Sequence, residues 1–152
     1  MRKKEYQITD FREIEKIIKS SLICRLGLCN DNVPYVVPLN FGYKDKVLYF
    51  HSAAEGKKIE YIRKNNNVCF EIEGPVQIIE AENACNWATK YSSIIGWGIV
   101  NFVSDPREKK IALDIIMKHH SKKTAWKYNE TSVKKVCIFK VIINKVDGKK
   151  VV

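Results

Sequence analysis

Short apolar runs separated by turn-forming residues recur along this chain, and the pattern predicts a mainly β protein. The runs are rich in Val, Ile, Leu, Tyr and Phe, which is typical of strands. Strands are expected over residues 22–29, 34–43, 47–51, 67–74, 76–82, 91–103 and 133–148, with turns at 30–32 and 44–46. The strand over 91–103 has a weak point at its Gly-Trp-Gly step.

Two segments with apolar residues at helical spacing predict capped helices. In residues 9–20, Asp10 is the expected N-cap and Glu13 completes a capping box. The apolar stripe of this helix is Phe11, Ile14, Ile17 and Ile18. In residues 104–121, Asp105 is the expected N-cap. The side chains expected to reach the core from this second helix are Ile111, Leu113, Ile115, Ile116 and Met117.

The spacing of these elements predicts the fold class. Most neighbouring strands lack a helix long enough to cross over between them, which disfavours a parallel sheet. We therefore expect one domain over residues 1–152, built as an antiparallel β-barrel with peripheral helices at its rim.

Composition limits where the protein works and what its cysteines do. Hydrophobic residues make up 45% and charged residues 29%, as in ordinary globular proteins. No apolar run approaches the roughly 20 residues that span a bilayer, and the start "MRKKEYQITDF" is not a secretory signal. We expect a cytoplasmic protein without a membrane segment.

The five cysteines show no C-x-x-C spacing and are odd in number. A disulfide framework or a zinc site is therefore not expected. Cys24, Cys29, Cys69 and Cys137 lie in apolar runs and are expected to be buried, reduced thiols.

Positive charge is concentrated near the C-terminus. The net charge is +10, and residues 120–152 hold nine lysines against two acidic residues. Such a block can bind nucleic acid or simply solvate a face. The lysines are scattered among strand formers without any arginine, so the solvated face is favoured.

The segment "VLYFHSAAEGKKIEYI" combines features of an anion site. Ser52 and Glu55 match a capping box, which predicts a helix over 52–65. The first N–H groups of a helix attract anions, phosphate above all. Small residues beside them leave room, and Lys57 and Lys58 add positive charge. The pattern indicates a phosphate site, although a plain surface helix has the same spacing.

The preceding strand contains two unusual residues. Pro38 lies in its middle, which indicates an edge strand or a local break. Asn40 lies in an apolar stretch, where its carboxamide needs partners. It suits the edge of a planar heterocycle, and it equally suits neighbouring backbone groups.

Other candidate residues have both chemical and structural interpretations. His51 is a candidate proton donor or a histidine bonded to its neighbours. His119 and His120 point about 100° apart on a helix, so they are expected to stabilise the helix C-terminus rather than bind metal. Four aromatic residues are candidates for an aromatic wall over a ligand or for the core or an interface. They are Trp87, Tyr91, Trp97 and Trp126.

Several of these motifs together resemble a known family. "CRLGL", "PYVVPLNFGY", "LYFHSAAEGKKI", "NVCFEIEG", "ACNW" and "YSSIIGWG" follow one another as in the pyridoxamine 5′-phosphate oxidase-like flavoproteins. The sequence is most similar to the nitroimidazole-resistance (Nim-type) branch. The resemblance extends from about Phe11 to about Gly148 and is most specific over 34–58.

The resemblance implies a split β-barrel, a homodimer, and FMN bound at two sites between the subunits. It implies three groups of cofactor contacts. Val37, Pro38, Leu39 and Asn40 would line the isoalloxazine ring, and His51, Ser52 and Ala53 would follow the ribityl chain and ring edge. Lys57 and Lys58 would hold the phosphate, and Tyr91 and Ser93 would reach the cofactor from the partner subunit. Ser92 stands where this branch often has arginine.

The resemblance favours an FMN-dependent oxidoreductase. Electrons would pass from a reduced small-molecule donor to a small acceptor such as a nitroaromatic, with His51 as the candidate catalytic residue. The alternatives are a flavin-binding protein without turnover and, less favoured, a basic barrel that binds nucleic acid. The C-terminal strand lacks the arginine pattern of true pyridoxamine phosphate oxidases, so that activity is not expected.

Overall fold

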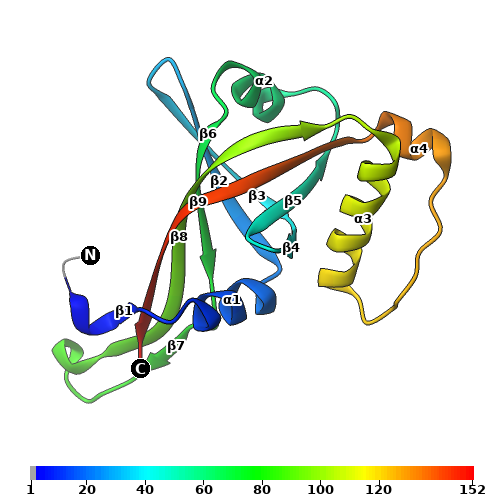
Figure 1. The fold of residues 1–152 in the computed structure, drawn as a ribbon. Helices are drawn as coiled ribbons and strands as arrows, with labels where there is room; N and C mark the ends of the chain where they lie inside the picture. The colour runs from blue at the N-terminus through cyan, green and yellow to red at the C-terminus, as the bar shows by residue number, and fades with distance from the viewer. Residues whose placement is uncertain (1–2) are drawn as a thin grey trace.

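The computed structural model describes residues 3–152. It is a β-barrel with helices at its rim (Figure 1). The strands are β1 (Gln7–Ile8), β2 (Ile23–Asn30), β3 (Val33–Asn40), β4 (Gly42–Lys44), β5 (Val47–Ser52), β6 (Asn67–Glu73), β7 (Gln77–Ile79), β8 (Ala88–Val103) and β9 (Cys137–Val151). The helices are α1 (Phe11–Ser20), α2 (Lys57–Lys64), α3 (Pro106–His120) and α4 (Glu130–Lys135), with 3₁₀ turns η1 (Lys4–Tyr6) and η2 (Ala84–Asn86).

One bent strand closes the barrel. The strands pair antiparallel in the order β3-β2-β6-β8-β9-β5-β4. Only Phe41 separates β3 from β4, yet β3 pairs with β2 and β4 pairs with β5. The two ends of the order are therefore halves of one chain segment that changes partner at Phe41. This confirms the predicted antiparallel split barrel.

Tight turns set the register on both sides of the bent strand. Asp31 and Asn32 have φ of 49° and 62°, and Asp45 and Lys46 have φ of 51° and 63°. Two successive residues at positive φ form the turn that matches the twist of a β-hairpin. Asn and Asp adopt this conformation more readily than most residues. The turns predicted at 30–32 and 44–46 are confirmed.

The core of the barrel is made by alternate side chains of its strands. Phe41, Phe50, Phe70 and Phe139 are all at most 1% exposed. Phe50 and Phe139 stack with ring centroids 5.1 Å apart. Each fully buried phenylalanine contributes about 1.5–3 kcal/mol relative to exposure, so this cluster is a main source of stability.

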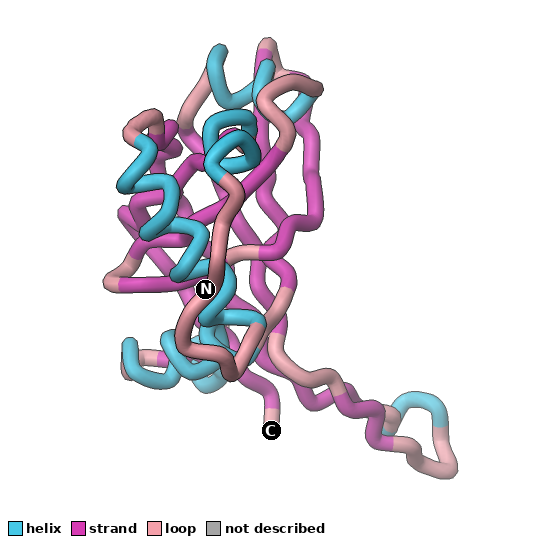
Figure 2. The backbone as a smooth tube through the Cα atoms, turned by 90° about the vertical axis from the view of Figure 1, so that its right-hand side faces the viewer, coloured by secondary structure: helices cyan, strands magenta, loops and turns pink. Residues whose placement is uncertain are grey.

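The weak point predicted in the long strand is an irregularity of the β8–β9 ladder. Trp97 pairs with Lys145, whereas the next residue, Gly98, pairs with Ile143. Asn144 is therefore an extra residue on β9, as in a β-bulge. Below the barrel, β7, η2 and the start of β8 form a projecting arm (Figure 2).

Helix α1 confirms the predicted N-cap and apolar stripe, but Glu13 bonds Lys150 instead of completing a capping box. The Asp10 carboxylate accepts a hydrogen bond from the Arg12 backbone N–H at 2.9 Å. Ile14, Ile17 and Ile18 are buried against the barrel. Glu13 accepts an ion-paired hydrogen bond from Lys150 at 2.6 Å, which ties α1 to the end of β9.

Helix α3 begins as predicted, but its buried face is narrower. Asp105 accepts from two backbone N–H groups of the first turn, while Ala112 and Ile116 make the contact with the barrel. Ile111 is 58% exposed and Met117 is 36% exposed, so their assignment to the core was wrong. The reason is geometric: one side of a helix packs on a strand, and apolar residues off that side remain outside.

The close packing of α3 depends on a glycine of β4. A Cβ atom at Gly42 would lie 2.7 Å from both Cα and N of Ile116. Any larger residue would therefore push the helix off the barrel.

The strand predicted over 133–148 begins later than expected. Residues 133–135 belong to α4, whose N-cap Asn129 accepts a hydrogen bond from the Ser132 N–H. The Lys109 ammonium donates to the carbonyls of Val133, Lys134 and Val136. These contacts satisfy the C-terminal carbonyls of α4. They stabilise a helix where the local sequence pattern predicts a strand.

The cysteines are reduced, but they are less uniformly buried than predicted. All five are free thiols. Cys24 is buried, Cys69 and Cys137 are half-buried, and Cys29 is exposed at the end of β2. The prediction that Cys29 is buried was therefore wrong, because its side chain lies on the outer face of the barrel. None of the helices formed by residues 3–152 has the length and apolar character needed to span a bilayer.

Two consecutive histidines fasten the end of α3 to the barrel. Nε2 of His119 lies 2.7 Å from the Ser21 carbonyl, and Nε2 of His120 lies 2.9 Å from the Phe41 carbonyl. A carbonyl only accepts, so each Nε2 carries the proton. These carbonyls lie where α1 meets β2 and where the bent strand changes partner. The predicted location at the helix end is confirmed.

His119 gives the fold a pH dependence. Burial lowers the pKa of its imidazole below 6.5, although the bond to Ser21 works in the opposite direction. The unfolded chain therefore binds a proton more readily, and stability falls as the pH drops through 6.5 toward the folded-state pKa. We expect His119→Gln to flatten the decline in the free energy of unfolding between about pH 7 and pH 5. Urea denaturation at constant ionic strength measures this, and a decline as steep as in the wild type would contradict it.

Candidate functional site

The candidate site is the corner where β5 leads into α2. Strand β5 ends at Ser52, an exposed turn covers residues 53–56, and α2 begins at Lys57. In Figure 1 this corner lies at the upper end of the barrel.

The structure corrects the predicted start of this helix. Ser52 is the last residue of β5 and is 8% exposed. Its hydroxyl donates to the Ala53 carbonyl at 2.8 Å instead of capping a helix. Gly56 is the N-cap, and no side chain bonds to the first turn of α2. The Ser52–Glu55 capping box was wrong, because the ladder with β9 extends to Ser52.

Gly56 leaves the first turn of α2 open. Its φ of 112° and ψ of 168° lie in a region that essentially only glycine adopts. Ile59 and Glu60 donate to the Gly56 carbonyl, whereas a helix start leaves its first N–H groups without an internal partner. A Cβ at Gly56 would meet nothing within 4 Å. A ligand can therefore approach the backbone closely here.

Lys57 is held in place by two tyrosines. Its ammonium lies 4.7 Å from the ring centroid of Tyr35 on β3 and 5.5 Å from that of Tyr61 on α2. The two rings contact edge to face at 5.5 Å. Cation–π attraction favours this geometry, so a positive charge is positioned between β3 and α2.

Lys58 extends toward a different part of the barrel. Burial raises the pKa of the Cys137 thiol, and Lys109, Arg63 and Lys58 partly oppose that effect. Cys137 is the ladder partner of Ser52. Successive helical residues point about 100° apart, so the two lysines place positive charge on two sides of the same helix start.

The four predicted ring-lining residues of β3 lie on two faces of the strand. Val37 and Leu39 are half-buried and pack on the core. Pro38 and Asn40 are exposed on the outer face. Asn40 therefore meets solvent rather than an apolar interior, in contrast to the environment expected from its neighbours.

The predicted edge character of β3 is confirmed. Strand β3 is the end of the strand order, and among residues 3–152 its one ladder partner is β2. Its other edge carries backbone N–H and C=O groups that are free to pair with a ligand. Pro38, which cannot donate to a ladder, is compatible with this position.

His51 and Ser52 have different environments although they are adjacent. His51 is exposed on the outer face of β5, and Ser52 faces inward. Ala53 begins the exposed turn. The imidazole is thus accessible to a molecule bound outside the corner.

Tyr91 and Ser93 lie at the opposite end of the barrel. Ser93 pairs with Glu73 at the end of β6, whereas α2 leads into the start of β6. The length of β6 separates the two ends by about 20 Å. Tyr91 accepts a hydrogen bond from Lys149. A single chain does not bring these two residues to Lys57.

The outer face beside Ser93 is apolar. Ile95, Trp97 and Ile99 alternate along β8 and are 36–44% exposed, and Ile142 on β9 is 40% exposed. A shallow cavity of about 260 Å³ is lined by Ser93, Ile95, Trp97, Asp147 and Lys149. We call the four apolar residues the outer apolar face.

The tryptophans do not form one wall within the chain. Trp87 is 51% exposed on the projecting arm, where its indole N–H donates to the Ala81 carbonyl. Trp97 belongs to the outer apolar face, and Trp126 lies in the loop after α3. Trp87 and Trp97 therefore lie outside the barrel core, which was one of the three interpretations of these residues.

Neighbouring groups engage three of the four lysines of β9. Lys150 pairs with Glu13, and Lys149 donates to Tyr91. Lys145 lies 3.6 Å from Asp147 and 5.2 Å from the Trp97 ring centroid. The charge of this strand is thus distributed over separate local contacts.

Sequence reasoning missed the tyrosine pair that holds Lys57. Tyr61 follows Lys57 by four positions, and such pairs lie on one helix face. The contact between Lys57 and Tyr61 could therefore have been predicted from the sequence. Tyr35 is brought to α2 only by the folding of the β2–β3 hairpin over the helix. The Asn65 carboxamide reinforces this docking by donating to the Cys29 carbonyl at 3.0 Å.

Several solved structures share this fold. A protein provisionally described as a 5-nitroimidazole antibiotic resistance protein, from Bacteroides thetaiotaomicron VPI-5482, is 37% identical, with a TM-score of 0.86 over 95% of this chain and 86% of its own. The flavocytochrome Anf3 from Azotobacter vinelandii is 15% identical, with a TM-score of 0.87 over 100% of this chain and 72% of its own. An FAD-binding protein from Mesorhizobium loti is 24% identical, with a TM-score of 0.70 over 96% of this chain and 97% of its own. The two more distant proteins support the fold alone.

A shorter sequence match and a family match complete the comparison. An uncharacterized protein of Rhizobium meliloti (strain 1021), RA0666, is 32% identical over 60 residues, which is 40% of this chain and 39% of that protein. Residues 10–150 match the family described as pyridoxamine 5′-phosphate oxidase. That match spans the barrel, the corner and both ends of β8, and this chain accordingly belongs to the pyridoxamine 5′-phosphate oxidase family.

Proposed function

We propose that this protein binds FMN and passes electrons from a reduced small-molecule donor to a small acceptor such as a nitroaromatic. The observation that carries the proposal is the corner itself. An open helix start at Gly56 and a positioned Lys57 lie beside the free edge of β3. Family membership and the 37% identical relative with its nitroimidazole description support the same chemistry.

The residues of the corner fit the parts of FMN. Phosphate suits the first N–H groups of α2 together with Lys57 and Lys58. The exposed turn at Ala53 leaves room for the ribityl chain, and the edge of β3 over residues 37–40 offers backbone groups to the polar rim of the ring. FMN would supply the electron-transfer chemistry, which no side chain provides.

The chain's own residues would bind, orient and donate protons. Lys57, which its two tyrosines fix, would hold the phosphate end of FMN. His51 is exposed at the same corner and would donate a proton to a bound acceptor through its imidazole. Pro38 and Asn40 would shape the outer side of that space.

A homodimer would complete the site. Tyr91 and Ser93 lie far from Lys57 within one chain, next to the outer apolar face. Pairing two copies through that face would bury exposed Trp97 and its neighbours and would bring Tyr91 and Ser93 to the partner's corner. Contiguous apolar surface of this kind is typical of an interface.

The first test is flavin binding itself. Freshly purified protein should be yellow and should release FMN on denaturation, identified by mass spectrometry. A colourless protein that takes up neither FMN nor FAD would contradict flavin binding. Release of FAD alone would contradict FMN as the cofactor, although the protein would still be a flavoprotein.

Lys57→Ala combined with Lys58→Ala should weaken FMN binding by at least about tenfold, because each charged hydrogen bond contributes about 1.5–3 kcal/mol. Fluorescence titration of the apoprotein measures this. Riboflavin lacks the phosphate, so its affinity should not change. Lys64→Ala, at the far end of α2, is the matched control. Equal losses of affinity for FMN and for riboflavin would contradict the proposal that these lysines bind the phosphate.

Turnover separates an enzyme from a flavin carrier. We expect NADH or NADPH oxidation that depends on a nitroimidazole or a quinone. His51→Gln should reduce the rate by about a hundredfold or more if it donates the proton, with FMN affinity unchanged. Flavin binding without any turnover would favour the non-catalytic alternative.

The dimer has its own test. Trp97→Asp places a charge in the outer apolar face and should yield monomers in sedimentation experiments, with weaker FMN binding. Ile111→Asp changes an isoleucine of α3 that is 58% exposed and should leave the dimer intact. Retention of the dimer by Trp97→Asp would contradict this interface.

A further inference from the structure

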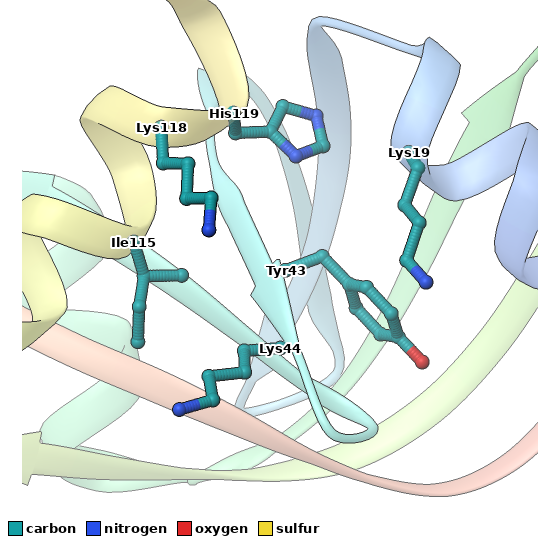
Figure 3. A pocket seen from close by; sticks show the side chains of 6 residues that line it. All are labelled: Lys19, Tyr43, Lys44, Ile115, Lys118 and His119. Atoms are coloured by element: carbon teal, nitrogen blue, oxygen red, sulfur yellow. The ribbon is translucent and has the colours of Figure 1, made fainter. Parts of the chain in front are cut away.

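A second basic cavity lies between α1, β4 and α3, away from the flavin corner. Its volume is about 380 Å³, and Figure 3 shows side chains from all three elements around it. Its lining consists of Lys19, Tyr43, Lys44, Ile115, Lys118 and His119. The cavity lies by the β4–β5 turn, where Lys44 pairs with Val47, whereas His51 lies at the other end of β5.

Positive charge exceeds negative charge in this cavity. Lys19, Lys44 and Lys118 come from three different elements and are exposed. The nearest carboxylate, Glu15, accepts from the Tyr43 hydroxyl at 2.7 Å and lies 3.5 Å from the Lys19 ammonium. The Tyr43 bond is the main cause that lowers the pKa of Glu15. Asp45, next to Lys44, also helps to raise the pKa of Tyr43, so two carboxylates stand near three ammonium groups.

His119 and two apolar groups complete the wall. The bond from Nε2 to Ser21 fixes the imidazole, which leaves Nδ1 of the neutral ring as an acceptor. In Figure 3 the His119 ring lies above the Tyr43 side chain, and Lys118 descends from the same helix. The Ile115 side chain and the Tyr43 ring add apolar surface.

The residue types indicate the class of ligand. The lining holds lysines and no arginine, so it lacks the bidentate fork that suits carboxylate and phosphate alike, and the attached organic group must distinguish one anion from another. Lysine ammonium groups act as point charges that suit the distributed charge of phosphate. The apolar wall suits an organic portion attached to that phosphate. A cleft lined by one sign of charge also concentrates such anions.

We propose that the cavity between α1, β4 and α3 binds a small organic phosphate. The ammonium groups of Lys19, Lys44 and Lys118 hold the phosphoryl oxygens, and Ile115 and Tyr43 contact the organic part. This site is separate from the proposed flavin corner and does not depend on it.

The probe is phenyl phosphate, titrated into the full-length protein in the presence of saturating FMN. Two-dimensional amide NMR should show saturable shifts at residues around Tyr43 and His119. Lys44→Ala and Lys118→Ala alter exposed side chains and should each weaken binding by about tenfold, the value of one charged hydrogen bond. Inorganic phosphate should bind more weakly than phenyl phosphate, because it lacks the apolar part.

Three controls make the result decisive. Lys127→Ala removes an exposed lysine outside the cavity and should leave the affinity unchanged. Lys57→Ala with Lys58→Ala should also leave it unchanged, which separates this site from the flavin corner even if FMN binding fails. Citrate should bind less tightly than phenyl phosphate. No saturable binding, wild-type affinity in both cavity variants, or tighter binding of citrate would each overturn the proposal.

Discussion

The change of ladder partner at Phe41 is the constraint on which the rest of the molecule depends. One strand pairs with β2 before this residue and with β5 after it, so the barrel closes without an additional strand. Phe41 is fully buried at this point, and its carbonyl accepts a bond from His120. A buried carbonyl without a partner would be costly. Closure of the barrel and docking of α3 are therefore coupled.

This arrangement separates two basic regions. The bent strand leaves β3 with a free edge next to α2, where Lys57 lies over two tyrosines. At the other end of β5, the docked end of α3 brings Lys118 and His119 to β4 and α1. Gly42 allows that docking, because a Cβ there would collide with the helix backbone. Each basic region thus follows from how a helix meets the bent strand.

The predicted site residues were recoverable from sequence to different degrees. Lys57 and Gly56 lie at a helix start, as the pattern indicated, but the N-cap is Gly56, four residues after the predicted cap Ser52. A capping box is a local signal, and here the ladder between β5 and β9 extended the strand through Ser52. The contact of Tyr35 with Lys57 joins residues far apart in sequence, and no local pattern reports such a contact.

By itself the sequence determined most of the local elements: the longer strands, both tight turns, and the capped starts of α1 and α3. These features depend on backbone conformation and on nearby residues, which sequence records directly. Tertiary structure decided which apolar residues lie outside the core, among them Ile111 and Trp97. It also decided which charged side chains line the same cavity, as Lys118 and Lys19 do. Such outcomes depend on how helices dock on a closed barrel, and that geometry is set by packing between residues distant in the chain.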